Sequence, residues 1–331
     1  MSNSPIIASM AFDQTTRILS FFDKSGATIS SIVVPEHESP EPTSHSCFFN
    51  SNEGFVENSG YDTPVTLVLS DGTTFSGQGA VTKGSSAFHP IEGDMSLLGK
   101  ASLGSYARFI TKDAVTKLSF ACAQRTASDQ TVTLAVYDAD GLLLDTMTLV
   151  KGNVTPREFS VSLSKPTRGF SIVPLGNNTA QYMYIDAVEW TEDASKNPPA
   201  PTESATLETW GDAYIAGLDT ATAGDELTAD GVTVLPWLTS GKFSAADSRL
   251  EIGGKVIAGG ICLFFKKTTS GCDPMTVENG HGESVYSACG KNTFLEIPIS
   301  CDGSEPIVIK PYSSSVRGLV LTGVAWRYKA R

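Results

Sequence analysis

The sequence predicts an all-β protein with two tandem antiparallel β-sandwich domains, jelly-roll-like in plan, behind a small N-terminal β-hairpin tab. Ser, Thr and Gly are abundant, whereas the runs of Leu, Ala, Glu and Lys that favour long helices are almost absent. Short strand-like segments recur, separated by turn residues about every 8–12 residues, which is typical of sandwiches. Internal repetition is the third observation: "MYIDAVEW" (183–190) and "LVLTGVAW" (319–326) share one plan.

The N-terminal segment, residues 1–45, is expected to hold the tab and a linker. "TRILSFFDKSGATISSIVV" places β-prone flanks around a D-K-S-G turn, where Asp and Gly supply local hydrogen bonding and a positive φ. "PEHESPEPTSHS" (35–46) then carries three prolines and no apolar residue, which marks a linker. Because two or three strands bury little surface alone, we expect the tab to pack against the next domain or another chain.

The first sandwich is expected at 46–194, a second linker at 195–204 and the second sandwich at 205–331. The second linker is polar and contains three prolines. The second sandwich repeats the order of segments in the first. "SRLEIGGK" follows the pattern of "MSLLGKAS", "GGICLFFKKTTS" that of "TKLSFACAQRTAS", "TFLEIPIS" that of "REFSVSLS", and "PIVIKPY" that of "GFSIVPL". The shared order indicates a divergent internal duplication.

The formal net charge is −12, and no cluster of Lys and Arg interrupts the acidity. Phosphate-backbone binding needs concentrated positive charge, so nucleic acid is not an expected partner, and an anionic membrane surface is disfavoured for the same reason. The N-terminus lacks a basic region leading into an apolar stretch, so no secretory signal is predicted. No segment approaches the roughly 20 apolar residues that span a bilayer. Synthesis and folding in the cytoplasm are therefore expected.

The sequence contains six cysteines, at positions 47, 122, 262, 272, 289 and 301. Cys122 and Cys262 lie inside strand patterns, where buried free thiols act as small hydrophobes. Reduced cysteines are favoured, with a bridge among Cys272, Cys289 and Cys301 as the alternative. These three and His281 lack the short C-x₂₋₄-C pairs of structural zinc sites, so core thiols and a loop histidine are expected there.

Catalytic constellations are scarce. His37 and His45 fall in the proline-rich linker, where nothing would hold an imidazole for general-base work. There is no G-x-S-x-G elbow, H-E-x-x-H motif or Gly-rich phosphate loop. A glycosidase needs only two carboxylates at a set spacing, but no segment nominates such a pair. We therefore predict no catalytic residues and no enzymatic activity.

A structural calcium ion is a candidate cofactor of the first sandwich. Asn52 and Glu53 in "FFNSNEGF" and Asp186 in "YIDAVEW" offer the oxygen ligands that calcium prefers. The first and last strands of antiparallel sandwiches are commonly neighbours, so these oxygens could meet. Thr322 stands at the equivalent place in the second sandwich, so the site would not be duplicated. The alternative is that Glu53 and Asp186 are merely solvated.

Candidate ligand-binding residues are aromatic, because sugars stack their C–H faces on aromatic rings. Those in or near turn-rich stretches are Trp210, Trp237, Tyr61, Tyr106 and Tyr312. For each of them the alternative is plain packing. Trp190 and Trp326, in the repeated Val-x-Trp, are expected in the core or between domains.

Several motifs resemble those of carbohydrate-binding-module jelly rolls: "FNSNEGF", "EGDMSLLGKAS", "LAVYDADGLLLDT" and the closing "YIDAVEW". The resemblance covers residues 48–192 and, more faintly, 205–331. It implies a β-sandwich, a structural calcium near the first and last strands, and a glycan site on a concave face or loop rim. Ala187 stands where the family pattern has a second Asp. Separately, "MAFDQTTRILSFFDKSGATISSIVVPE" resembles segments that open virion proteins of phages infecting gut Bacteroidetes.

The leading hypothesis is a non-enzymatic structural and adhesion protein on a bacteriophage virion surface, as a head or tail fibre or decoration component. Residues 1–45 would attach it to other virion or surface subunits, and the sandwiches would bind host glycans. We expect a homo-oligomer, made in the host cytoplasm. The first alternative is a secreted or cell-surface bacterial carbohydrate-binding protein. The second is a glycan-active enzyme with a shallow carboxylate site.

Overall fold

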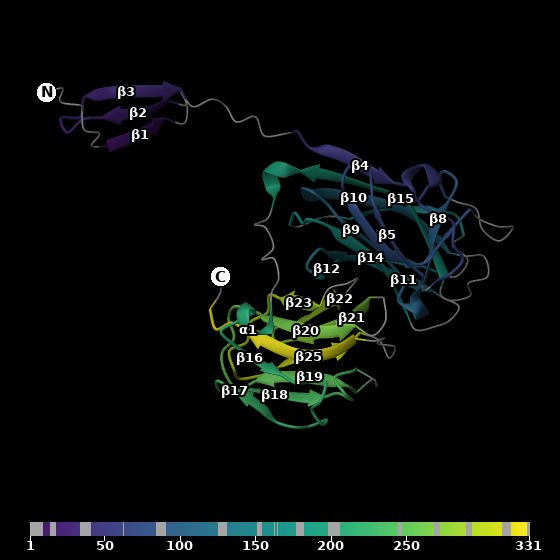
Figure 1. Cartoon of the computed structure of the whole chain (residues 1–331). Coiled ribbons are helices and arrows are strands. Elements are labelled where there is room, and N and C mark those ends of the chain that lie inside the picture. Colours follow the sequence, from purple (N-terminus) through teal and green to yellow (C-terminus); the bar gives the residue numbers. More distant parts are fainter. Residues whose placement is uncertain are drawn as a thin grey trace. The chain divides into compact units, whose positions relative to one another are not determined.

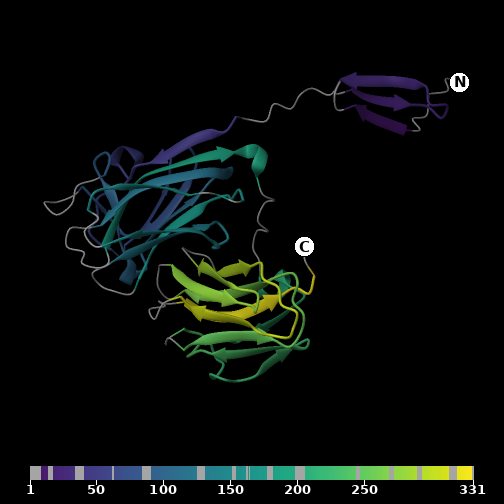
Figure 2. The same ribbon diagram turned by 180° about the vertical axis from the view of Figure 1, so that it is seen from behind.

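Strands make up nearly all of the regular structure in the computed structural model (Figures 1 and 2). It describes residues 9–13, 18–33, 41–61, 63–83, 91–124, 131–150, 154–161, 163, 165–176, 182–197, 206–243, 247–267, 272–288, 293–312 and 319–329. Among these residues the one α-helix is α1 (Leu207–Trp210), and no helix is long enough to cross a membrane. Short 3-10 turns are η1 (Ser51–Glu53), η2 (Ala101–Leu103) and η3 (Ala194–Lys196). The all-β prediction is confirmed.

The chain forms two units, residues 1–41 and 42–331. The first holds a three-stranded antiparallel sheet in the order β1 (Ser9–Asp13), β2 (Ile18–Phe22) and β3 (Thr28–Val33). The β2–β3 hairpin turns at the D-K-S-G segment, where an Asp23 carboxylate oxygen accepts hydrogen bonds from the Ser25 and Ala27 N–H groups (2.8 and 3.0 Å). None of the side chains described in this unit is buried, so its strands build no core among themselves.

The first sandwich consists of two antiparallel sheets. Its strands are β4 (Thr43–Cys47), β5 (Pro64–Val68), β6 (Thr74–Gln78), β7 (Ala80–Thr82), β8 (Ser96–Lys100), β9 (Tyr106–Ile110), β10 (Ala114–Gln124), β11 (Val132–Asp138), β12 (Leu143–Leu149), β13 (Arg157–Val161), β14 (Phe170–Leu175) and β15 (Tyr182–Asp193). One sheet has the order β13-β10-β15-β8-β7, with β4 also paired to β15, and the other has the order β12-β11-β14-β9-β6-β5.

The second sandwich is built in the same way (Figure 1). Its strands are β16 (Ala213–Ala216), β17 (Leu227–Ala229), β18 (Val232–Trp237), β19 (Arg249–Gly253), β20 (Ile261–Lys267), β21 (Asp273–Glu278), β22 (Glu283–Ala288), β23 (Phe294–Ile297), β24 (Ile307–Pro311) and β25 (Leu319–Trp326). The sheets have the orders β16-β25-β20-β23 and β17-β18-β19-β24-β21-β22. Each sheet turns its alternate apolar side chains toward the other, as the period of two requires.

The two sandwiches share one topology. The order β16-β25-β20-β23 matches β4-β15-β10-β13, and β17-β18-β19-β24-β21-β22 matches β5-β6-β9-β14-β11-β12. This agrees with the repetition seen in the sequence at four of its segment pairs. The pairing of "SRLEIGGK" with "MSLLGKAS" was wrong, because β19 occupies the place of β9, whereas β8 and its neighbour β7 have no counterpart in the second sandwich.

The repeated Val-x-Trp places one indole in each core, as the sequence predicts. Trp190 is 2% and Trp326 0% exposed. The Trp190 ring packs against Phe109 and Phe170, with ring centroids 5.4 and 6.0 Å apart. Burying a large side chain of this kind stabilises a fold by about 1.5–3 kcal/mol, so each closing strand anchors its own sandwich.

The first sandwich begins earlier than the sequence indicates. Strand β4 pairs with β15 from Thr43 onward, with His45 opposite Trp190. The placement of His45 in a linker was therefore wrong, because its strand is hydrogen-bonded at the edge of a sheet. The reason for the error is that "TSHS" consists of polar residues only. Such a segment suits an edge strand with one side in water, but it lacks the apolar alternation that would mark it as a strand. His37 and His89 lie outside the described residues.

The cysteine prediction was right for four thiols and wrong for one. Cys47, Cys122, Cys262 and Cys301 are free and buried. Burial raises the pKa of each of the Cys47, Cys122 and Cys262 thiols, which makes them unreactive. Cys272 is disulfide-bonded, and Cys289 lies outside the described residues. Cys272 directly precedes β21, which pairs with β22.

Candidate functional site

Strands β18, β19 and β24 present an outward surface on the second sandwich, which we name the Trp237 face. Alternation along β18 buries one set of side chains and leaves Trp237, at the strand end, 40% exposed. Cross-strand register then sets Arg249 opposite Trp237 and Glu251 opposite Leu235. The Trp237 face consists of Thr233, Leu235, Trp237, Arg249, Glu251 and Val308.

The Trp237 ring is held in place by its neighbours. The Arg249 guanidinium lies 4.8 Å from the ring centroid, and its Nε pairs with a Glu251 carboxylate oxygen at 2.5 Å. A Cβ at Gly224 (φ +88°) would come within 3.2 Å of the six-membered ring, so the glycine leaves that part of the indole uncovered. The result is a fixed, partly exposed aromatic ring beside hydrogen-bonding groups.

Two depressions lie beside one another along this surface and share Pro306. The smaller, of about 220 Å³, is lined by Thr233, Leu235, Glu251, Gly253, Gly254, Gly303, Ser304 and Pro306. The larger, of about 410 Å³, is lined by Glu278, Gly280, Gly282, Glu283, Glu305, Pro306 and Val308. Several of the residues that line both depressions are glycines, which have no side chain to obstruct an extended ligand.

A carboxylate pair stands in the larger depression. Both Glu278 oxygens accept hydrogen bonds from Lys310 Nζ (3.0 and 2.9 Å), and this contact lowers the pKa of Glu278. A hydrogen bond with Glu278 raises the pKa of Glu283, so Glu283 takes up a proton first as the pH falls. The pair supplies an acceptor and, once Glu283 is protonated, a donor.

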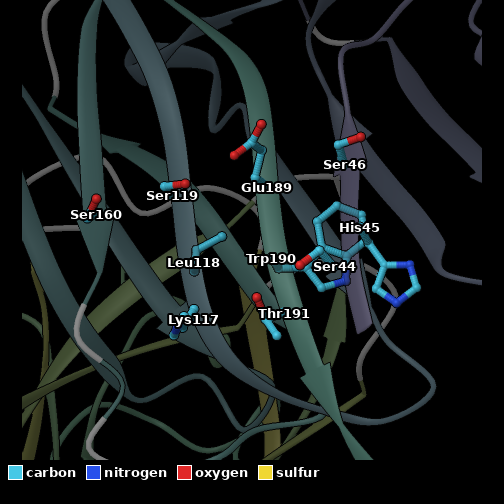
Figure 3. Close-up of a pocket in the computed structure, with 10 residues that line it drawn as sticks. All are labelled: Ser44, His45, Ser46, Lys117, Leu118, Ser119, Ser160, Glu189, Trp190 and Thr191. Carbon is cyan, nitrogen blue, oxygen red and sulfur yellow. The ribbon is translucent and has the colours of Figure 1, made fainter. Parts of the chain in front are cut away.

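The first sandwich has a depression of about 510 Å³ on the outer side of β4, β15, β10 and β13 (Figure 3). It is lined by Ser44, His45, Ser46, Lys117, Leu118, Ser119, Ser160, Glu189, Trp190 and Thr191. Hydroxyl groups dominate, and none of these residues offers an exposed ring face, because Trp190 is 2% exposed. The surface can donate and accept hydrogen bonds but cannot stack a sugar.

Two of the predicted ligand-binding aromatics are buried. Trp210 is 4% exposed, with the Arg327 guanidinium 3.7 Å from its ring centroid and its indole N–H donating to Glu296. Tyr106 is 5% exposed and belongs to a buried cluster that also contains Cys272. Both rings are covered by protein, so neither can stack on a ligand in this structure.

The other predicted aromatics are accessible to different degrees. Tyr61 is half-buried and packs edge-on against Tyr182, with centroids 5.3 Å apart and Lys100 Nζ 4.9 Å from the Tyr182 ring. Tyr312, 42% exposed, follows β24 and donates its N–H to the Pro274 carbonyl. Neither lines one of the three depressions described above.

The predicted calcium ligands face hydrogen-bond donors. Asp186 is fully buried and accepts from the Ile91 and Glu92 N–H groups and the Ser96 hydroxyl. Both Glu53 oxygens accept from the Phe48 N–H, and one also accepts from the Asn50 N–H.

A carboxylate has about four lone-pair sites, and Asp186 already accepts four hydrogen bonds, those above and one from the Ala187 N–H, so Asp186 does not fit a calcium site in this arrangement. Asn52 is exposed in η1. Calcium binding by this chain stays a prediction.

Trp237 is among the ligand-binding candidates that the sequence predicts, and its neighbours are not. Arg249 and Glu251 belong to "SRLEIGGK", whose alternation shows which residues face outward. Their position beside Trp237 depends on the pairing of β18 with β19, which no local sequence pattern indicates. The Glu278–Lys310 contact likewise joins two strands that are far apart in the sequence.

No protein-family model and no curated protein matches the chain. Among solved structures, the K2 cleaved adhesin domain of Lys-gingipain covers 45% of this chain and 99% of its own, with 12% identity and a TM-score of 0.34. The K1 domain of Lys-gingipain from Porphyromonas gingivalis covers 46% and 99%, with 17% identity and a TM-score of 0.30.

A third solved structure extends over most of the chain. Tandem family 51 carbohydrate-binding modules of a family 98 glycoside hydrolase from Streptococcus pneumoniae cover 85% of this chain and 99% of their own, with 12% identity and a TM-score of 0.28. At such values these likenesses assign no ligand and no activity here. The tandem sandwich architecture rests on the strand pairing itself.

Proposed function

We propose that the chain is a non-catalytic glycan-binding protein whose second sandwich holds the sugar on the Trp237 face. The observation that carries this proposal is a fixed indole, 40% exposed, at the end of β18, the strand whose Thr233 and Leu235 line the smaller of two adjoining depressions; Trp237 itself lines neither depression. A sugar ring stacks its apolar face on an aromatic ring and needs hydrogen-bond partners for its hydroxyl groups. The depression on the first sandwich supplies only the second of these.

The charges along the groove favour a neutral glycan. Glu251, Glu278, Glu283 and Glu305 line the two depressions, and the nearby cations Arg249 and Lys310 are each already paired with a carboxylate. A sulfated or uronic-acid sugar would meet uncompensated negative charge there. Neutral oligosaccharides are therefore the class of ligand that this surface suits.

The carboxylate geometry argues against a glycosidase at this place. Glu278 and Glu283 are in direct hydrogen-bond contact. Glycosidases separate their two carboxyl groups by about 5–5.5 Å or about 6.5–9.5 Å, so that the sugar or a water fits between them. Incubation with a panel of polysaccharides should release no new reducing ends. Product release would favour the glycan-active enzyme instead.

The N-terminal unit serves as an attachment module in this proposal. None of its described side chains is buried, and Met10, Ile32 and Val33 are 65%, 54% and 68% exposed. A three-stranded sheet without a core gains stability by packing against another chain, and we place that chain in a phage virion surface. The alternative is a secreted or cell-surface bacterial protein. A disulfide at Cys272 suits the oxidising surroundings that both locations share.

Truncation tests the attachment role. Because β4 begins at Thr43, removing residues 1–41 should leave both sandwiches folded while abolishing incorporation into the assembly. Normal incorporation of the truncated chain would exclude this role for the N-terminal unit.

Glycan binding is tested by calorimetry of the full chain with neutral oligosaccharides chosen from an array. Trp237→Ala should weaken binding at least about tenfold, which corresponds to about 1.4 kcal/mol. Tyr214→Ala is the matched control, because Tyr214 is 42% exposed but lies on β16 in the other sheet of the same sandwich. Equal affinity of Trp237→Ala and the wild-type chain would refute the assignment of this face, and so would failure of every neutral glycan to bind.

A further inference from the structure

An imidazole and two carboxylates meet at one edge of the first sandwich, which we name the His45 corner. His45 Nδ1 lies 2.8 Å from a carboxylate oxygen of Asp71, and Nε2 lies 3.7 Å from one of Glu192. One ligand atom from each of the three side chains lies within 4.8 Å of the others. The side chains are 17%, 19% and 6% exposed, so the corner is partly shielded yet open to water.

Both carboxylates of the His45 corner are held in their orientations by hydrogen bonds from neighbouring N–H groups. The second oxygen of Asp71 accepts the Thr73 N–H at 2.8 Å. Glu192 accepts the Asp113 N–H at 2.7 Å on one oxygen and the Trp190 indole N–H at 2.9 Å on the other.

The imidazole itself stacks on the Trp190 ring, with centroids 5.7 Å apart and planes 20° from parallel (Figure 3). No lysine or arginine in the described part of the chain forms an ion pair with Asp71 or Glu192.

The second sandwich contains the same corner with different side chains. Ala213 lies opposite Trp326 on β16, where His45 lies opposite Trp190 on β4. The Trp326 indole N–H donates to the Tyr328 hydroxyl at 3.0 Å, where Trp190 donates to Glu192. The fold therefore needs an acceptor for the indole but needs neither an imidazole nor a second carboxylate.

A lysine lies at the equivalent place of the second sandwich, where it is 44% exposed. Lys255 Nζ lies 3.4 Å from a carboxylate oxygen of Asp230, in the turn equivalent to that of Asp71, and 4.0 Å from the centroid of the Tyr328 ring. The first sandwich has two carboxylates at this place and no lysine among the described residues that pairs with them. In the first sandwich the group that contacts both carboxylates is the imidazole of His45, which is also a potential metal ligand.

We propose that His45, Asp71 and Glu192 bind a divalent transition metal ion of the zinc class. Zinc accepts imidazole nitrogen and carboxylate oxygen, whereas calcium and magnesium prefer oxygen alone. Metal–ligand bonds of about 2.1 Å in a tetrahedron separate the ligand atoms by about 3.4 Å. Nδ1 faces Asp71 and Nε2 faces Glu192, so one of the two nitrogens would be the ligand, and ligand atoms up to 4.8 Å apart would have to approach by up to about 1.4 Å. Three protein ligands leave a fourth position for water.

The bound metal would join the two sheets of the first sandwich. His45 on β4 and Glu192 on β15 belong to one sheet, and Asp71 lies in the turn between β5 and β6 of the other. Strand β4 is the first strand after the N-terminal unit, so the metal would fix the point at which that unit is tethered.

Zinc titration of the full chain tests this proposal, with calorimetry as the readout. We expect one zinc ion at the His45 corner, and His45→Ala should weaken that binding at least about tenfold. Ala213 at the equivalent position shows that the fold accommodates the smaller residue. His281→Ala is the control, because His281 is an exposed histidine outside the corner and its loss should leave the affinity unchanged.

Cobalt provides a second readout, visible absorption, which the substitutions would not change if His45 and Asp71 had a purely structural role. The Co²⁺-loaded chain should show visible d–d absorption bands, and both His45→Ala and Asp71→Asn should remove them. Asp71→Asn keeps an acceptor for the Thr73 N–H, so it removes charge without removing that hydrogen bond. The proposal is overturned if the wild-type chain takes up no zinc, or if His45→Ala binds zinc as tightly as the wild type.

Discussion

Replacing Asp186 with alanine should destabilise the first sandwich more at acidic than at neutral pH. The side chain is fully buried on β15 and accepts hydrogen bonds from the Ile91 N–H (3.1 Å), the Glu92 N–H (2.9 Å) and the Ser96 hydroxyl (2.5 Å). Burial nevertheless dominates and raises the pKa of Asp186 from 3.8 to about 6. The folded state therefore holds this proton more tightly than the unfolded state does.

The sign of the effect follows from proton linkage. Between pH 3.8 and about 6 the folded chain binds more protons at Asp186, so its contribution to stability is complete below pH 4 and is lost as the pH rises through 6. A shift of about two pKa units corresponds to about 3 kcal/mol. Asp186→Ala removes this contribution. The loss of stability on mutation should therefore be about 2 kcal/mol larger at pH 4, where the unfolded state is itself partly protonated, than at pH 7.5.

Urea unfolding between pH 4 and 7.5 measures this difference, with hydrogen exchange of the β10 and β15 amides reporting on the first sandwich, because three of the four tryptophans lie in the second. Other titrating groups are common to both proteins and cancel in the comparison. Asp94→Ala is the control, because Asp94 belongs to the same sandwich and a hydrogen bond from the Ser51 hydroxyl lowers its pKa, so its linkage falls below pH 3.8. The cost of that substitution should be constant over the range. A cost of Asp186→Ala that is constant, or that shrinks in acid, would refute the reasoning.

Two smaller predictions concern the backbone and the thiols. Ala187 has φ +46° at the bulge where β15 shifts register against β10, so Ala187→Gly should raise the free energy of unfolding by up to about 1 kcal/mol; a lower urea midpoint would contradict this. Four of the six cysteines are free and Cys272 is bonded, so the unfolded, unreduced chain should present four reactive thiols and the reduced chain six. Six thiols before reduction would show that no disulfide forms.

The strand content could be predicted from sequence because it depends on local patterns, and the repeat of Val-x-Trp was enough to indicate two related sandwiches. Edge strands were harder to place. "TSHS" has no apolar residue, so no local pattern distinguishes a polar strand from a linker. Its pairing with β15 is what shows that His45 lies on a strand. A bridge among Cys272, Cys289 and Cys301 was the alternative and not the favoured prediction for a similar reason, because cysteine spacing does not indicate which strands become neighbours.

The candidate sites depended even more on pairing. Trp237 could be selected as an aromatic near a turn, but its exposure and its Arg249 neighbour follow from the β18–β19 register. Trp210 and Tyr106 satisfied the same sequence criterion and are buried. An aromatic residue near a turn is therefore a poor guide to a binding surface until the covering strands are known.

The duplication itself provides a test of which residues the fold requires. The two sandwiches have the same strand order, so a feature that the architecture demands should occur in both. The buried indole with a hydrogen-bonded N–H does occur in both, at Trp190 and Trp326. The imidazole and paired carboxylates of the His45 corner occur only in the first copy, and the exposed Trp237 beside Arg249 occurs only in the second, since Gln78 at the matching end of β6 is buried. Because the same strand order forms without either feature in the other copy, the fold does not require them. The calorimetric experiments with neutral glycans and with zinc test separately whether each feature binds a ligand.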